Sequence, residues 1–181
     1  MRRTSMLTLA VLIGLAAAVG AGAPGSAREP ALPYVQLIGP DSAIVERGFH
    51  RIRDQQAWHD LWKRHIGEDP VIAGINMAPE IDFDRCEVIA FFRGKATNTR
   101  GERVEAIDDL EGHRRIRFDA STYQTASLFE GEPDHGDACT PYGLWVIERT
   151  DSAIVIEENV QGLIGKPAIW QEKFRFEAPT D

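Results

Sequence analysis

One short loop of the sequence gathers residues of the kinds that bind metal ions. Residues 130–137 contain no basic residue and carry four carboxylates and one imidazole, from Glu130, Glu132, Asp134, His135 and Asp137. Ca²⁺ prefers several oxygen ligands on a turn-forming loop, whereas Zn²⁺ prefers imidazole with carboxylate or thiolate. The spacing matches no EF-hand, and one histidine makes a poor zinc site. Glu132, Asp134, His135 and Asp137 are a candidate metal site for a hydrolase. A solvated acidic loop is the simpler interpretation.

The chain has two cysteines, Cys86 and Cys139. In an oxidising compartment an even pair indicates a disulfide, and we expect one here because both residues precede predicted strands. The alternatives are two separate buried thiols, or a nucleophilic Cys139 with His135 as its base. No Gly-x-Ser-x-Gly sequence is present, so serine hydrolysis of that type is not predicted.

Arginines in three successive predicted strands form a candidate surface for an anionic ligand or an acidic partner. Acidic residues are interleaved with them, which favours a solvent face laced with ion pairs. Trp170 follows a proline-containing segment, and an exposed aromatic ring there would suit a binding surface, although core packing is the default for tryptophan. The candidate surface comprises Arg100, Arg103, Arg115, Arg117 and Trp170.

The first 27 residues have the three-part pattern of a secretory signal peptide. Arg2 and Arg3 provide a positive start, an uncharged and mostly apolar run spans residues 6–19, and small residues lead to Ala27. We expect Sec-type export and cleavage after Ala27, to the periplasm or the medium. A retained anchor is the alternative, but the strongly apolar core is shorter than the roughly 20 residues that cross a bilayer.

Removal of this leader leaves 154 of the 181 residues, with 18 basic and 28 acidic side chains. That length predicts a single domain. We expect residues 28–33 to be a flexible lead-in, 34–177 one globular domain and 178–181 a tail. The acidic balance disfavours nucleic acid and anionic membranes as partners.

Apolar spacing predicts one helix among many strands. Trp58, Leu61, Trp62 and Ile66 recur at helical spacing and predict an amphipathic helix over 55–66, capped by the residues on either side. Short turns between the strands predict antiparallel pairing. The expected class is α+β, a mainly antiparallel curved sheet or sandwich with one N-terminal amphipathic helix packed on it. The predicted strands are 34–38, 43–47, 49–53, 87–93, 103–110, 114–119, 142–149, 153–160 and 168–176.

The order of these segments resembles a known family. The helix with Leu61-Trp62 precedes Ile81-Asp82-Phe83 and the apolar strand Val88–Phe92, and a polar hairpin between two glycines, residues 94–101, follows. Pro141-Tyr142 then leads another apolar strand. Over residues 43–160 this set is similar to the PrcB C-terminal-like domain of secreted bacterial proteins. The resemblance implies an accessory module of a secreted protease, with no catalytic residues to carry over.

These observations together favour a binding role. We expect an exported, non-enzymatic accessory protein, without a cofactor, whose partner is another extracytoplasmic protein such as a protease. Exposed sheet edges would offer such a partner a place for strand addition. The alternatives are a metal-dependent hydrolase that uses the 130–137 loop and a small-ligand carrier with a pocket between helix and sheet.

Overall fold

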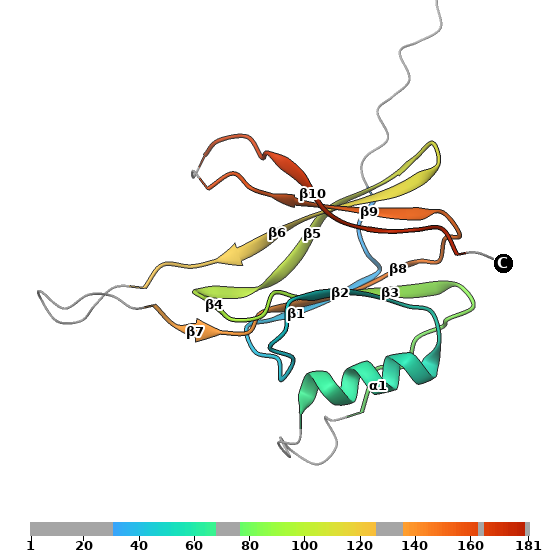
Figure 1. Ribbon diagram of the computed structural model, residues 1–181, viewed down its shortest axis with the longest axis horizontal. Coiled ribbons are helices and arrows are strands. Elements are labelled where there is room, and N and C mark those ends of the chain that lie inside the picture. Colours follow the sequence, from blue (N-terminus) through green and yellow to red (C-terminus); the bar gives the residue numbers. More distant parts are fainter. Residues whose placement is uncertain (1–30, 68–76, 126–135, 163–164, 180–181) are drawn as a thin grey trace, which may run out of the picture.

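Segments of alternating apolar and polar residues form two facing sheets in the computed structural model, which describes residues 31–67, 77–125, 136–162 and 165–179 (Figure 1). Ten strands and one helix lie within these ranges. In chain order they are β1 (Val35–Gly39), β2 (Gly48–Ile52), α1 (Gln55–Ile66), β3 (Cys86–Phe92), β4 (Ala96–Thr97), β5 (Thr99–Leu110), β6 (His113–Thr122), β7 (Ala138–Cys139), β8 (Tyr142–Glu148), β9 (Ala153–Asn159) and β10 (Trp170–Phe176).

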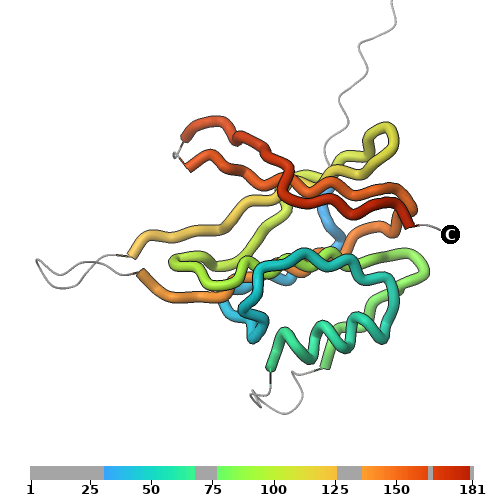
Figure 2. Tube along the Cα trace, viewed as in Figure 1, coloured from blue at the N-terminus to red at the C-terminus, as the bar shows by residue number. Residues whose placement is uncertain are grey.

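The strands form two four-stranded sheets and a short two-stranded one. One large sheet has the order β1-β8-β3-β2, and the other has the order β10-β9-β6-β5. The small sheet pairs β4 with β7. Every pair is antiparallel except β6 and β9, which run parallel because the chain between them passes through β7 and β8 before it returns. Figure 2 follows this path along the Cα trace.

The main core lies between the two large sheets. Phe91 and Trp145 from the first sheet meet Ile116, Phe118 and their neighbours from the second, and these side chains are fully buried. Along β6, buried and half-buried residues alternate, which is the pattern of a strand with one face on the core. Sheet-on-sheet packing of this kind is the arrangement of a β-sandwich.

Helix α1 covers the opposite face of the first sheet. Asp54 caps it by accepting a hydrogen bond from the Ala57 amide at 2.8 Å, and Gly67 ends it at a positive φ of 69°. Trp58 and Leu61 pack against residues of β3 and β8 in a second buried cluster. The predicted helix over 55–66 and both its caps are confirmed.

The expected α+β class is wrong. The described residues are mostly β, with 51% of them in strands and 9% in one short helix. The helix is not N-terminal either, because β1 and β2 precede it. The strong amphipathic pattern of the helix led to the α+β prediction. The larger core, however, forms between the two sheets. The strand predicted over 43–47 does not form, because the Ser42 hydroxyl accepts a hydrogen bond from the Ile44 amide at 3.1 Å and holds a local turn there.

The expected disulfide between Cys86 and Cys139 is also wrong, since both thiols are free. Cys86 begins β3 opposite Glu148, whereas Cys139 lies three residues before Tyr142, which pairs with Phe92 at the far end of β3. The length of β3 therefore separates them by about 20 Å, at roughly 3.3 Å per residue. A disulfide needs Cα atoms within about 7 Å.

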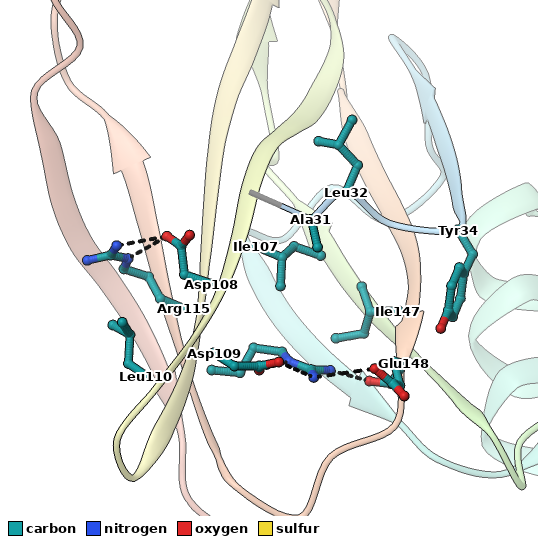
Figure 3. A pocket seen from close by; sticks show the side chains of 11 residues that line it. Ala31, Leu32, Tyr34, Ile107, Asp108, Asp109, Leu110, Arg115, Ile147 and Glu148 are labelled. Carbon is teal, nitrogen blue, oxygen red and sulfur yellow. Dashed lines mark hydrogen bonds and ion pairs between the residues drawn. The ribbon is translucent and has the colours of Figure 1, made fainter. Parts of the chain in front are cut away.

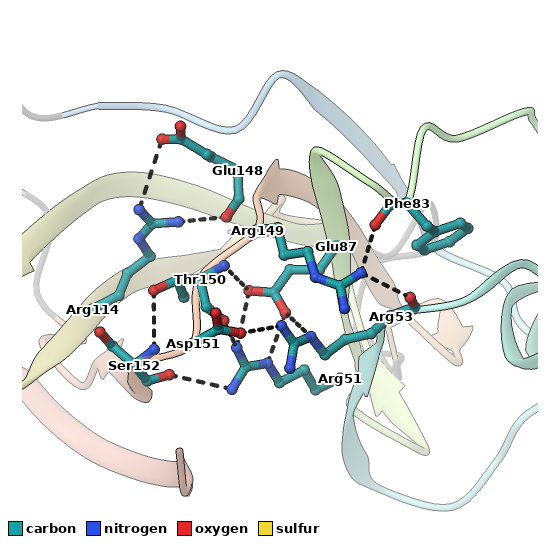
Figure 4. A network of polar contacts seen from close by, with 10 residues as sticks. All are labelled: Arg51, Arg53, Phe83, Glu87, Arg114, Glu148, Arg149, Thr150, Asp151 and Ser152. Atoms are coloured by element: carbon teal, nitrogen blue, oxygen red, sulfur yellow. Dashed lines mark hydrogen bonds and ion pairs between the residues drawn. The ribbon is translucent and has the colours of Figure 1, made fainter. Parts of the chain in front are cut away.

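Buried carboxylates close the two ends of the sandwich. At one end Glu87, which is fully buried, receives two hydrogen bonds from Arg51 at 2.7 and 3.2 Å and one from the Thr150 amide at 3.1 Å (Figure 4). At the other end Glu102 is equally buried and is paired with Arg93, which also binds Glu158 at 2.6 Å. Both buried carboxylates are thus held by charged hydrogen bonds, which is the condition under which a buried ion pair is tolerated.

Candidate functional site

The two sides of the sandwich, where the edge strands of the two sheets face each other, are joined by different interactions. On one side the edge strands β1 and β5 are joined. The Gln36 side chain accepts a hydrogen bond from the Val104 amide at 2.9 Å and donates one to its carbonyl at 3.3 Å. Ala31 exchanges two backbone hydrogen bonds with Ile107, at 3.1 and 2.7 Å. The free backbone groups of β5 are therefore partly satisfied within the chain itself.

On the opposite side the edge strands are β2 and β10, and no strand ladder joins them (Figure 1). Aromatic rings bridge the gap instead. Phe49 of β2 stacks on Phe91 with ring centroids 4.2 Å apart and on Phe174 of β10 at 5.2 Å. Phe174 keeps 39% of its surface exposed. The side between β2 and β10 is called the open seam below. The outer edge of β2 has no partner strand there and lies beside a cavity.

A groove of about 520 Å³ runs along the open seam. Its floor is apolar, and its polar groups stand on the α1 wall and on β2. It is lined by Phe49, His50, Arg51, Ile52, Ala57, Asp60, Leu61, Arg64 and Phe176. Because β2 is an outer strand, alternate residues direct their backbone N–H and C=O groups away from β3 and toward this groove. The groove thus combines unpaired backbone groups with an apolar surface.

The groove has two arginines, and only one of them has an ion-pair partner among the described residues. Arg51 is committed to Glu87. Arg64 is exposed, and no carboxylate within the described ranges lies within ion-pair distance of it. Burial, and then the positive charge of Arg64, lower the pKa of His50 below its ordinary value. Asp60, one turn before Arg64, accepts two hydrogen bonds from Gln56 at 3.1 Å.

A second cavity, of about 300 Å³, lies on the closed side (Figure 3). Ile107, Ile147 and Ala31 form its apolar floor, and the exposed side chains of Leu32 and Tyr34 stand at its rim. Five charged residues also line it: Asp108, Asp109, Arg114, Arg115 and Glu148. Both arginines are paired, Arg114 with Asp109 at 2.6 Å and Arg115 with Asp108 at 2.7 Å, and Figure 3 marks the Arg115–Asp108 contact with dashed lines.

The predicted arginine surface is only partly assembled. Arg115, Arg117 and Trp170 lie together on the outer face of the second sheet, where Arg117 stands over the Trp170 ring at 5.3 Å. Glu157 is 2.8 Å from Arg117 and 3.9 Å from Arg115. These arginines are thus held in ion pairs.

Among the described residues, neither of the other two predicted arginines contacts the Trp170 ring or pairs with Glu157. Arg100 lies over the ring of Tyr123 at 5.1 Å. Arg103 is exposed on β5 opposite Asp119. Neither is therefore part of the ion-paired group around Glu157.

Of the candidate metal ligands, only Asp137 falls within the described residues; Glu132, Asp134 and His135 lie outside them. Asp137 accepts a hydrogen bond from the Tyr123 hydroxyl at 2.9 Å, and its amide donates to the Asn98 side chain at 2.7 Å. In the part of the chain that the structure describes, no three His, Cys, Asp or Glu side chains are grouped as metal ligands would be.

Sequence reasoning missed the residues of the open seam. Residues 49–53 were predicted as strand, yet nothing local indicates that this strand is an edge. Phe174 and Phe176 alternate with charged residues, which marks a half-exposed strand and not its partner across the seam. Arg64 falls outside the apolar stripe of the predicted helix, and only the packing of α1 beside β2 places it on a groove.

No family model, curated protein or solved structure matches this chain. Within the described residues, no helix has the length and apolar character needed to span a membrane.

Proposed function

We propose that this protein is an exported accessory protein that binds a partner protein at the open seam, by accepting an extended segment of the partner along the free edge of β2. The observation that carries the proposal is the difference between the two sides of the sandwich. Gln36 and Ala31 close one side, and β2 is left unpaired beside a groove on the other.

Strand addition suits this groove for two physical reasons. The free N–H and C=O groups of β2 supply sequence-independent hydrogen bonds to an extended segment, and the adjacent side chains supply specificity. The floor formed by Phe49, Leu61 and Phe176 offers apolar surface that an incoming side chain would bury. A groove of about 520 Å³ is large enough for a few such side chains.

The neighbouring edge is less suitable for pairing. The register of β10 shifts between Glu172 and Phe174, which marks an irregularity of the ladder, and Lys173 lies between them. Bulges and lysines are features by which edge strands avoid pairing with other chains. The five residues of β2 pair with β3 in one continuous register and are therefore the better template.

An NMR titration with a neutral eight-residue peptide of alternating valine and glutamine tests this proposal. We expect shifts of backbone amides in β2, with smaller shifts in α1 facing the groove. The matched control peptide carries N-methyl groups on alternate residues, which removes its strand-pairing donors, and it should not bind. If both peptides bind equally, or if the shifts fall on β1 and β5, strand addition at β2 is wrong.

The cavity on the closed side favours a second candidate function, that of a small-ligand carrier. Its apolar floor of Ile107 and Ile147 lies beside a rim of charged side chains, an arrangement that would suit an amphiphilic molecule. Native mass spectrometry of the protein purified from its own source should reveal a retained small molecule, and substitution Ile147→Trp, which fills the cavity, should abolish it. A ligand-free mass in the wild type would remove this candidate.

A further inference from the structure

The two walls of the open-seam groove differ in polarity, and the side chains of an added strand would contact both walls. Side chains of a strand point alternately to its two faces. A segment paired with β2 would therefore direct every second side chain to the face of Phe49, and the others to the face of His50 and Ile52, beside α1.

We propose that the segment bound by β2 is acidic, with apolar side chains alternating with carboxylates, and that a carboxylate lies beside Arg64 and His50. This inference rests on the function proposed above and specifies the class of partner. The outcome of the test separates the two proposals.

The face of Phe49 requires the apolar side chains. Phe49 stacks between Phe91 and Phe174, and Phe176 lines the same groove. Arg51 lies on this face too, but its guanidinium is held by Glu87, so it leaves no free positive charge for a ligand. A charged side chain placed here would lose hydration without gaining a partner.

The face beside α1 requires the carboxylates. Arg64 is exposed and lines the groove, and no carboxylate among the described residues pairs with it. His50 of β2 lines the same groove and feels the positive charge of Arg64. Asp60 lies one helical turn away and would repel a carboxylate at that end, which sets the position of the anionic group at the Arg64 end.

The net charge of −8 on the whole chain does not cancel this local preference. At physiological ionic strength the Debye length is about 8 Å, so distant exposed carboxylates are largely screened while an adjacent arginine is not. The side chain that a ligand would contact therefore decides the preference.

The test compares three eight-residue peptides by NMR titration at 0.15 M salt. In each, valine alternates with glutamate, glutamine or lysine. We expect the glutamate peptide to bind about fivefold more tightly than the glutamine peptide, the size of one exposed ion pair, and the lysine peptide to bind most weakly. Arg64→Glu should reverse the order of the glutamate and lysine peptides. The matched control is Lys63→Glu, which makes the same charge change on the same turn of α1 outside the groove and should preserve the order.

The outcomes separate the two proposals. If the glutamine peptide shifts β2 amides but glutamate gives no advantage, or Lys63→Glu acts as strongly as Arg64→Glu, the acidic class is wrong and strand addition stands. If none of the three peptides shifts β2 amides, both proposals are wrong. A circular dichroism spectrum and an unfolding midpoint for each variant establish that it folds, and Arg64→Gln replaces Arg64→Glu if the latter does not.

Discussion

Phe49 of β2 and Phe174 of β10 stack face to face with ring centroids 5.2 Å apart, although their strands share no backbone ladder. The two sheets are therefore joined at this edge by side chains, through these rings and the Arg47–Glu158 ion pair, and not by a backbone ladder. Gln36 and Ala31 join the sheets on the other side through hydrogen bonds. This difference between the two sides is the reason for proposing strand addition at the open seam.

Substitutions of the stacked pair should separate packing within the core from packing across the seam. Phe49→Ala removes contacts with three rings and should lower the free energy of unfolding by about 3 kcal/mol. Phe174→Ala removes a side chain that is 39% exposed and should cost about 1 kcal/mol. Urea unfolding of both single variants and the double variant gives the coupling energy, expected at about 0.5–1.5 kcal/mol. Additive single effects would contradict a direct Phe49–Phe174 interaction.

Loss of the buried carboxylate of Glu87 should be far more damaging than loss of an exposed one. Glu87→Ala leaves Arg51 buried without its anion, because Arg51 has a side chain only 8% exposed. The expected loss is about 3–5 kcal/mol in the free energy of unfolding. The control is Glu148→Gln, whose side chain is 67% exposed and lies 3.9 Å from Arg114, and it should cost less than about 1 kcal/mol. Equal effects would mean that the Glu87 pair is not a structural requirement.

The two thiols should be free in the purified protein. Without reductant, alkylation of the unfolded chain should add two groups, which mass spectrometry counts directly. In the folded protein both should react slowly, because Cys139 is buried and burial raises the pKa of Cys86. A mass with no added group in the unfolded chain would show a disulfide, and would contradict the separation of the two residues along β3.

The local features of this fold could be predicted from the sequence, and the long-range ones could not. The helix over 55–66 has a cap at Asp54, an apolar stripe and a terminating glycine, all within 14 residues, and it was predicted correctly. The parallel pairing of β6 with β9 joins residues about 40 positions apart, and no local pattern marks it. The wrong disulfide and the wrong fold class share this cause, since both depend on which strands are neighbours.

The candidate site shows the same division. Arg115, Arg117 and Trp170 were grouped from their types, and they do meet, but the ion pairs to Glu157 depend on the sheet order. Arg64 had no distinguishing local signal. Arg64 matters because no carboxylate of the described residues lies within ion-pair distance of it. Only the folded structure shows which side chains are neighbours.

His65 should make the protein lose stability in mild acid. It is 6% exposed, packed 4.2 Å from the Tyr142 ring centroid, and its Nδ1 is hydrogen-bonded to the Ser42 hydroxyl at 2.9 Å. Burial lowers its pKa from 6.5 to about 4. Between these two values the unfolded chain binds the proton and the folded chain does not, so the free energy of unfolding falls as the pH falls from 6.5 to about 4. Above pH 6.5 the full stability is present, and the total loss from this group is about 3 kcal/mol.

Urea unfolding at pH 7.5, 6.0, 5.0 and 4.5 measures this effect as a difference between wild type and His65→Asn. The asparagine keeps a polar group near Ser42 but does not titrate, so the variant should be less stable at pH 7.5 and should lose less stability than wild type on acidification. The control is His59→Asn on the exposed face of the same helix, which should follow the wild-type curve. Parallel curves for wild type and His65→Asn would mean that His65 is not the titrating group. The carboxylates contribute equally to the pH dependence of stability in all three proteins. Their contribution cancels in the comparison, because each variant differs from wild type at one histidine only.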